Sequence, residues 1–395
     1  MSVSRTKSNQ AKSRNQKPLW YYGAVGLAGL AVAKLIGVES FLPEEPKQVS
    51  RLKREETQVT TWPMTDPVAH GLDNEALTQL AELVGGAGFV SHRGKGVYQW
   101  GHANRSRYAA SVKKSIISVL NLQAVERGLL SGVDEPVVKF EPRLKGLNGG
   151  KDSTMTWRQL GCMTSGYGTV DAPGDAFCYS DYTVALWYDT LMDKVYQEKG
   201  TEVLRRQLAE PLGFEDPVTF QAFGAEGAEP KLRISARDLA RFGQLILDGG
   251  VAGGKRVLSE GMMETLLGSV VPVSVPISEG KAAEMIPGQK SVGGEMWNIS
   301  PIGPGLYTFH LWKNERGPSG LTMLPDAPRD TMLATGKWGE VALWIIPSLE
   351  LVVAWNGSAI DDHHLAQTNP EAKMNVAAGL MVRATAKLPL VAEAR

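Results

Sequence analysis

The segment Ala109-Ala110-Ser111-Val112-Lys113-Lys114-Ser115-Ile116-Ile117-Ser118 begins an apolar run with helical spacing that continues to Gly128. The rest of the fold is organised around it. Ser111 and Lys114 are three residues apart, which places them on one helix face. A serine hydroxyl becomes a nucleophile when a base removes its proton, and lysine serves as that base only if its pKa falls well below about 10.4. Burial and the positive end of the helix dipole are two effects that lower a lysine pKa, and both are expected to act at Lys114.

The Ser-x-x-Lys spacing alone is not specific, because the chain contains three further copies. These are Ser4/Lys7, Ser50/Lys53 and Ser278/Lys281. The Ser111 copy differs because it opens an apolar helical run. The alternative interpretation is an amphipathic core helix with an incidental serine.

The N-terminal part of the chain carries its own signals. The first 18 residues are basic without an acidic residue, although the 395-residue chain has a formal net charge of zero, which argues against a nucleic-acid binder. Residues 19–38 are long and apolar enough to cross a bilayer, with Trp20-Tyr21-Tyr22 suited to the interface. We expect an uncleaved membrane anchor that places the catalytic domain outside the cytoplasm, periplasmic or extracellular. The alternatives are a signal peptide cleaved at Ala31-Val32-Ala33, which gives a secreted protein, and a non-membrane helix.

The remaining sequence predicts a linker at 39–65 and one large domain at 66–395. The fold class is α/β (α+β): an antiparallel sheet flanked by helices, with an inserted, mostly helical region at about 126–233. The predicted helices are 73–84, 111–126, 235–247 and 372–386, and the predicted strands are 88–91, 97–100, 308–312, 331–335, 340–346 and 351–355. Residues 269–304 predict long loops.

Two further motifs follow the serine helix in a fixed order. Tyr179-Ser180-Asp181 lies in the helical region, and Lys337-Trp338-Gly339 lies at the entrance to a late strand. Together with Ser111-x-x-Lys114, they resemble the serine β-lactamase and penicillin-binding-protein superfamily. The resemblance covers about residues 68–385 and is closest to class C β-lactamases and their esterase, D-amino-peptidase and aminohexanoate-dimer-hydrolase relatives.

The resemblance implies a role for each motif residue. Ser111 attacks a carbonyl and forms an acyl-enzyme, while Lys114 and Tyr179 share the general-base role and Tyr179 protonates the leaving group. Lys337 binds a substrate carboxylate or biases the tyrosine, and Gly339 lets an edge strand approach the substrate closely. The backbone N–H groups of Ser111 and Glu340 form the oxyanion hole.

Two residues depart from the family pattern. Asp181 stands where asparagine is usual, and Trp338 stands where a small residue is common. An ionised Asp181 beside Lys114 favours the ammonium and makes that lysine a worse base. Tyr167 and Tyr182 are alternatives to Tyr179 as the family tyrosine.

Other reactive side chains support no rival site. His363-His364 follows two aspartates but has no spaced third ligand, so no metal and no cofactor are expected. Cys162 and Cys178 are either a disulfide or two buried thiols.

The sequence therefore predicts an exported serine hydrolase acting on a small ester, amide or peptide. A β-lactamase or a peptidoglycan D-amino peptidase would use the same residues. An alternative of another class is a non-catalytic, membrane-anchored binding protein on this fold. No nucleic-acid partner is expected, and the sequence leaves the oligomeric state open.

Overall fold

Two apolar runs late in the chain form a central hairpin of the main sheet. Strands β13 (Val341–Ile346) and β14 (Leu351–Asn356) pair antiparallel with Ile346 opposite Leu351. The turn Pro347–Leu349 joins them, and Glu350 takes a left-handed conformation (φ 47°). Every residue of both strands is buried, so both faces of the sheet are covered at its centre.

The computed structural model describes residues 61–221, 232–288, 296–297, 304–317, 320, 322–362 and 371–386. Residues 58–395 form one compact unit. The predicted membrane segment at 19–38 and the His363-His364 pair lie outside the described residues. Within the described ranges, no helix is long and apolar enough to cross a membrane.

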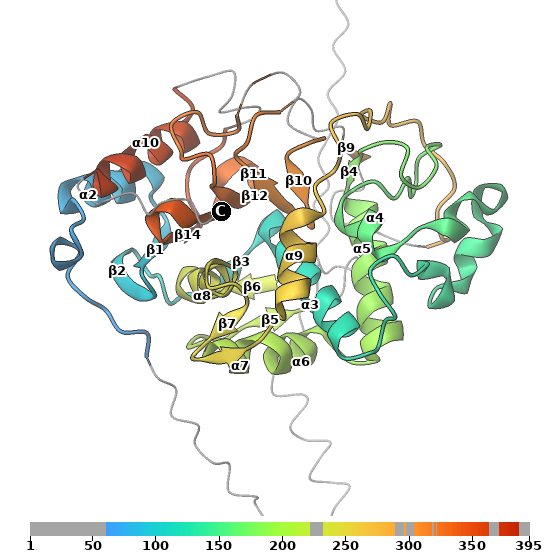
Figure 1. Cartoon of the computed structure of the whole chain (residues 1–395), viewed down its shortest axis with the longest axis horizontal. Helices are drawn as coiled ribbons and strands as arrows, with labels where there is room; N and C mark the ends of the chain where they lie inside the picture. Colours follow the sequence, from blue (N-terminus) through green and yellow to red (C-terminus); the bar gives the residue numbers. More distant parts are fainter. Residues whose placement is uncertain are drawn as a thin grey trace, which may run out of the picture. The chain divides into compact units, whose positions relative to one another are not determined.

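The main sheet has seven antiparallel strands in the order β10-β11-β12-β13-β14-β1-β2 (Figure 1). Its other strands are β1 (Ala87–His92), β2 (Lys95–Trp100), β10 (Tyr307–Thr308), β11 (Leu311–Lys313) and β12 (Met332–Gly336). Three small sheets surround it: β3 (Arg107–Tyr108) with β6 (Leu232–Ile234) and β5 (Thr219–Phe220), β4 (Tyr179–Ser180) with β9 (Met296–Trp297), and β7 (Val251–Ala252) with β8 (Lys255–Arg256).

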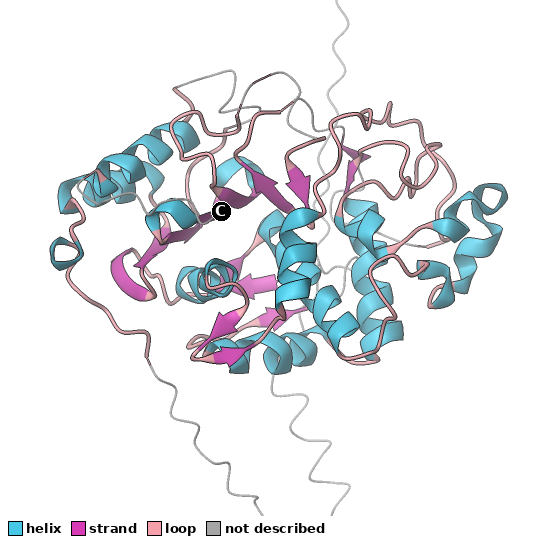
Figure 2. Cartoon of the chain, viewed as in Figure 1, coloured by secondary structure: helices cyan, strands magenta, loops and turns pink. Residues whose placement is uncertain are grey.

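The helices are α2 (Asn74–Val84), α3 (Lys113–Glu126), α4 (Trp157–Gly161), α5 (Asp181–Thr190), α6 (Gly200–Leu204), α7 (Glu210–Leu212), α8 (Ala236–Leu247), α9 (Glu260–Gly268) and α10 (Lys373–Thr385). Figure 2 shows helices on both sides of the sheet, and the segment between β3 and β6 is mostly helices and loops, in line with the helical region that the sequence predicts at about 126–233. The predicted fold class is confirmed.

Two of the helices that cover the sheet, α2 and α8, begin at capping side chains and bury an apolar face. Asp73 accepts hydrogen bonds from two backbone N–H groups of the first turn of α2, and the Ser235 side chain accepts one from the Asp238 N–H of α8. Helices α2 and α10 lie side by side, and α8 packs against β13, β14 and β1 (Figure 1).

The helix α8 approaches the sheet most closely at Gly243. A Cβ atom at this position would lie 2.6 Å from Val352 Cγ1 and 2.7 Å from Leu343 Cδ1. We therefore expect Gly243→Ala to lower the free energy of unfolding by about 1–3 kcal/mol through overpacking. Chemical denaturation measures this change. The matched control is Gly261→Ala in α9, where a Cβ meets no atom within 4 Å, and equal stability of both variants would contradict the prediction.

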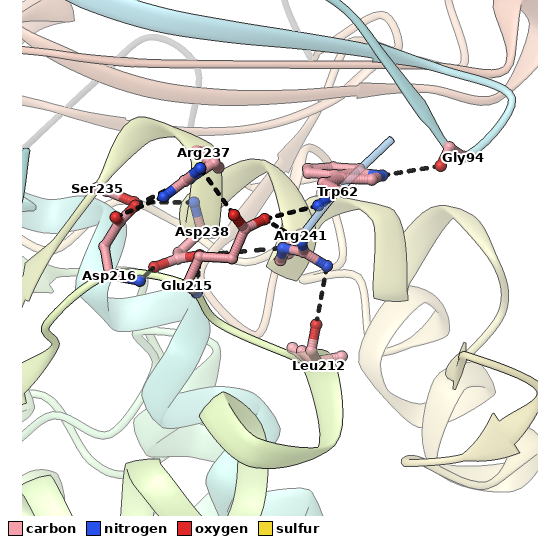
Figure 3. Close-up of polar contacts among 9 residues, drawn as sticks. All are labelled: Trp62, Gly94, Leu212, Glu215, Asp216, Ser235, Arg237, Asp238 and Arg241. Carbon is pink, nitrogen blue, oxygen red and sulfur yellow. Dashed lines mark hydrogen bonds and ion pairs between the residues drawn. The ribbon is translucent and has the colours of Figure 1, made fainter. Parts of the chain in front are cut away.

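A network of charged side chains ties the start of the domain to α8 (Figure 3). Glu215 Oε1 accepts a hydrogen bond from Trp62 N at 2.8 Å, and its carboxylate pairs with both Arg237 and Arg241. Asp238 accepts two backbone N–H groups of the same loop. Because the charges are paired and the indole is buried, this network fixes where the described chain enters the domain.

Three sequence predictions differ from the structure. Residues 308–312 are not one strand, because Phe309 and His310 are both left-handed (φ 37° and 61°) and form the turn between β10 and β11. The serine helix begins at Lys113, with Ser111 in the preceding 3₁₀ turn Ala110–Val112. Trp62 stacks on Phe89 at 4.8 Å, so the domain begins inside the segment predicted as linker.

Candidate active site

The serine motif lies where strand β3 passes into helix α3. Ala110 is left-handed (φ 45°), and the N–H of Lys113 closes the turn on the Ala110 and Ser111 carbonyls. A left-handed alanine costs about 1–2 kcal/mol, and such strain persists where surrounding packing requires it. Ser111 is therefore held, half-buried, at the positive end of α3 and three residues before Lys114.

Lys114 brings the first two motifs together. Its side chain is 1% exposed, and its Nζ lies 2.9 Å from Asp181 Oδ1 and 3.8 Å from the centroid of the Tyr179 ring. Tyr179 belongs to β4, and Asp181 begins α5, which Ser180 caps. The structure thus brings together Lys114, Tyr179 and Asp181, as predicted from motifs about 65 residues apart in sequence.

The electrostatics of this group decide between opposing effects on Lys114. Burial alone lowers the pKa of Lys114, but the Asp181 carboxylate and Tyr179 together outweigh it and raise that pKa above its ordinary value. Burial raises the pKa of Asp181, but Lys114 outweighs this and lowers it. The effect expected of an ionised Asp181 therefore exceeds that of burial, because Asp181 stabilises the ammonium in a buried ion pair.

Tyr179 is favoured over Tyr167 as the family tyrosine by its position. Tyr167 is buried elsewhere, with its hydroxyl accepting the N–H of Ile286 at 3.0 Å and its pKa raised by burial. Tyr179 instead lies against Lys114 and stacks on Trp312, with ring centroids 6.3 Å apart. The hairpin β10–β11, which supplies Trp312, therefore supports the tyrosine from behind.

The third motif forms the turn between β12 and β13. Lys337 Nζ pairs with Glu340 Oε2 at 3.1 Å, and the Lys337 side chain is 57% exposed. Two of the predicted backbone roles are not seen here. The N–H of Glu340 donates to the Lys337 carbonyl at 3.1 Å, and a Cβ atom added at Gly339 would meet Ile360 Cγ2 and Met374 rather than the serine turn. Trp338 and Lys337 are left-handed, so this segment turns where an extended strand was expected.

Gly336 is the residue that sequence reasoning missed. A Cβ on Gly336 would lie 2.8 Å from Ser111 N and 2.6 Å from Ala110 Cβ. Strand β11 pairs with Met332 and Leu333 of β12, which leaves the end of β12 alongside the serine turn. The signal in the sequence was a glycine that ends an apolar strand directly before Lys337. The close approach of strand and substrate was instead assigned to Gly339, and that glycine was placed on an edge strand. Here β12 lies between β11 and β13.

The two cysteines are not activated as reactive groups. Cys162 and Cys178 are both buried free thiols, and burial raises the pKa of each to about 11, so both stay protonated. Within the part of the chain that the structure describes, no group of three or more possible metal ligands is present.

The geometry, with a serine turn, a buried lysine, a tyrosine and a neighbouring strand, defines a protein of the serine β-lactamase and penicillin-binding-protein superfamily. The family model described as Beta-lactamase matches residues 74–356, and the chain belongs to this family. The fold and the family prediction are confirmed, and the family is one of hydrolases.

The individual relatives described next each share less than 30% sequence identity with this chain. The chain is 29% identical over 184 residues to the 6-aminohexanoate-dimer hydrolase of Paenarthrobacter ureafaciens, and this match spans 45% of the length of each protein. A β-lactamase structure from Mycobacterium bovis has a TM-score of 0.53 at 17% identity, covering 79% of this chain and 98% of that one. A penicillin-binding protein homolog from Caulobacter crescentus has a TM-score of 0.53 at 14% identity, covering 83% and 99%.

Proposed function

We propose that this protein is a serine hydrolase that cleaves an ester or amide bond through an acyl-enzyme on Ser111. The observation that carries the proposal is the convergence of Lys114, Tyr179 and Asp181 beside the Ser111 turn, with Lys114 and Asp181 2.9 Å apart. Such a group can activate a serine and deliver a proton to a leaving group.

Each side chain has a defined role in the proposed reaction. In this proposal Tyr179 takes part as the phenolate, and Ser111 Oγ attacks the carbonyl carbon while its proton passes to the Tyr179 oxygen, because an ammonium at Lys114 has no lone pair to accept it. The same proton then goes to the departing alcohol or amine, which restores the phenolate. Water later attacks the acyl-enzyme, giving up a proton to Tyr179 that returns to Ser111 as the acid leaves. Lys114 stabilises the negative charge on the Tyr179 oxygen before that oxygen takes each proton and after it releases it.

The oxyanion site follows from the position of β12. Ser111 N lies against Gly336, so the carbonyl oxygen of a substrate is expected between the serine turn and the end of β12. In this proposal, backbone N–H groups between the serine turn and the end of β12 take the oxyanion-binding role that was predicted for the Glu340 N–H. The Glu340 N–H instead donates to the Lys337 carbonyl. Loss of one such donor in other hydrolases costs roughly 2.7–4 kcal/mol.

Gly336 is therefore expected to be essential for the activity. We expect Gly336→Ala to reduce kcat/KM about 100-fold, because the new methyl group displaces β12 from the Ser111 backbone, and misplacement by about 1 Å costs that much. Steady-state kinetics measures it, with circular dichroism to confirm folding. The control is Gly132→Ala, where a Cβ meets no atom within 4 Å, and an unaffected Gly336→Ala enzyme would contradict the proposed oxyanion site.

The substrate class within this chemistry is tested by a direct screen. We expect hydrolysis of p-nitrophenyl esters or a linear 6-aminohexanoate amide, since Asp181 and Trp338 depart from the β-lactamase pattern and one relative is named for such an amide. Nitrocefin and D-alanyl peptides test the β-lactamase and D-amino-peptidase alternatives. Turnover of none of these, by folded protein, favours the non-catalytic binding protein.

We also propose that the domain works outside the cytoplasm, held by residues 19–38 as an anchor or released from them as a signal peptide. The basic segment before the apolar run supports this orientation. Fractionation of cells that express the full chain tests it, and recovery of unprocessed protein from the cytoplasm alone would overturn it.

A further inference from the structure

The turn between β10 and β11 contacts helix α3 one helical turn after Lys114. Ser118 donates its hydroxyl proton to the Phe309 carbonyl at 2.6 Å. The same Ser118 oxygen lies 3.3 Å from His310 Nδ1. Because the hydroxyl proton is used on the carbonyl, the imidazole Nδ1–H is the donor in this second contact. The turn is therefore tied by two contacts to the helix that carries Lys114.

His310 also contacts helix α5. Its ring stacks on Trp187, with the ring centroids 4.9 Å apart and an interplanar angle of 29°. The Trp187 indole N–H in turn donates to Asn121 Oδ1 of α3 at 2.8 Å. Helix α5 begins at Asp181, so His310 joins the helix that carries Lys114 to the helix that carries its carboxylate partner.

The hairpin that contains His310 also supports the tyrosine of the site. The ring centroids of Tyr307, in β10, and Trp312, in β11, lie 6.1 Å and 6.3 Å from that of Tyr179. Tyr307 and Trp312 pack on each other, with centroids 4.4 Å apart. One hairpin therefore contacts the lysine helix, the aspartate helix and the tyrosine ring.

The state of His310 is costly, and packing alone does not explain it. The residue is left-handed (φ 61°) and 3% exposed, and its Nε2 has no hydrogen-bond partner in the part of the chain that the structure describes. Burial and the charge of Lys114 hold the pKa of His310 well below its ordinary value, so the ring is neutral. An apolar ring would fill this space without an unpaired polar nitrogen. The imidazole adds a donor for Ser118 that stays uncharged near an ammonium.

We propose that His310 is a positioning residue of the proposed hydrolase, which joins α3 to α5 as a neutral imidazole and so fixes the distance between Lys114 and Asp181. This inference rests on the proposed function. The attraction within an ion pair falls with distance, and this pair is close at 2.9 Å. If α5 moves away from α3 while Lys114 stays buried, the ammonium loses its partner. The Tyr179 phenolate then loses the cation that stabilises it.

The test replaces His310 with leucine, an apolar side chain that neither stacks as a flat ring on Trp187 nor donates to Ser118. We expect His310→Leu to lower kcat for p-nitrophenyl acetate about 100-fold with little change in KM, because misplacement by about 1 Å costs this much. A pH titration by NMR of ¹³C-labelled lysine is the second measurement. The Lys114 ammonium is expected to lose its proton at lower pH than in the wild type, because burial then outweighs a weakened ion pair.

The matched control is His92→Leu. His92 is also a buried histidine, 1% exposed, but it ends β1, and its Nδ1 lies 3.2 Å from His70 Nδ1. This change is expected to lower stability toward urea and to leave both kcat and the Lys114 titration as in the wild type. Wild-type values of kcat and of the Lys114 titration in folded His310→Leu overturn the proposal. An equal shift in His92→Leu also overturns it.

Ser118→Ala decides the question if His310→Leu does not fold. The change removes one oxygen and, with it, the tie between α3 and the β10–β11 turn. We expect kcat to fall about tenfold, as for the loss of one hydrogen bond, and the Lys114 titration to move in the same direction as in His310→Leu. Wild-type behaviour of Ser118→Ala in both measurements overturns the positioning role.

Failure of the proposed function gives a different result. In that case no ester shows Ser111-dependent turnover in the wild type, and the NMR titration alone judges the role of His310. A lower pKa of Lys114 in His310→Leu than in the wild type supports the positioning role without any turnover, and an unchanged pKa overturns it.

Discussion

Replacing Ser111 with alanine is expected to abolish covalent labelling by a fluorophosphonate probe and to reduce ester hydrolysis by about 10⁶-fold, the loss found when another hydrolase loses its serine nucleophile. The physical reason is that, among the serines of this described helix and the turn before it, Ser111 alone lies three residues before Lys114 and is not within the core. Ser115 and Ser118, the next serines of the same helix, donate to backbone carbonyls in the core. Gel fluorescence and steady-state kinetics measure the two effects.

The matched control for this variant is Ser278→Ala. Ser278 and Lys281 repeat the Ser-x-x-Lys spacing, but they lie in a loop, where the Ser278 hydroxyl bonds Asp171 and Lys281 pairs with Glu279. Labelling should survive this change. Folded Ser111→Ala protein that still labels or turns over esters would show that Ser111 is not the nucleophile, and the non-catalytic interpretation gains support if the wild type also fails to label.

Periodicity in the sequence was sufficient for the long elements of the fold. Helices α2 and α8 begin one residue after the predicted starts, Asp73 and Ser235, whose side chains cap them, because caps and an apolar face act locally. The β10–β11 hairpin was not predicted, because periodicity detects only such local signals. Its turn residues, Phe309 and His310, are left-handed although neither is glycine or asparagine, and both are buried against the serine helix. Tertiary packing, which no local pattern encodes, imposes that turn.

The residues of the candidate site and the direction of the Asp181 effect were predictable, but not which effect on Lys114 is the larger. Motif order assigned Ser111, Lys114 and Tyr179, and the structure brings the lysine and tyrosine together. The pKa of Lys114 depends on the 2.9 Å approach of Asp181, a distance between segments about 65 residues apart, and this approach outweighs burial. The role of Gly336 depends in the same way on which strand end meets the serine turn.

Asp181→Asn is expected to retain or raise the acylation rate at neutral pH. With Asp181 ionised, the pKa of Lys114 lies above its ordinary value, so the lysine is an ammonium throughout the working range. Removing the carboxylate leaves burial as the dominant effect, which lowers that pKa. A base contributes through its unprotonated fraction, and this fraction rises about tenfold for each unit by which the pKa falls. The alkaline rise of the pH–rate profile should therefore move to lower pH in the variant.

Single-turnover acylation between pH 6 and 10 measures the shift, and Asp175→Asn, at an exposed aspartate before the Tyr179 motif, is the matched control. A neutral Lys114 can take the Ser111 proton itself, so the variant would share the base role between lysine and tyrosine, whereas the wild type relies on Tyr179. If activity collapses while thermal unfolding is unchanged, the Asp181 carboxylate takes part in the reaction. In that case the ion pair with Lys114 is needed for catalysis rather than a restraint on it, because a neutral asparagine preserves the shape but not the charge.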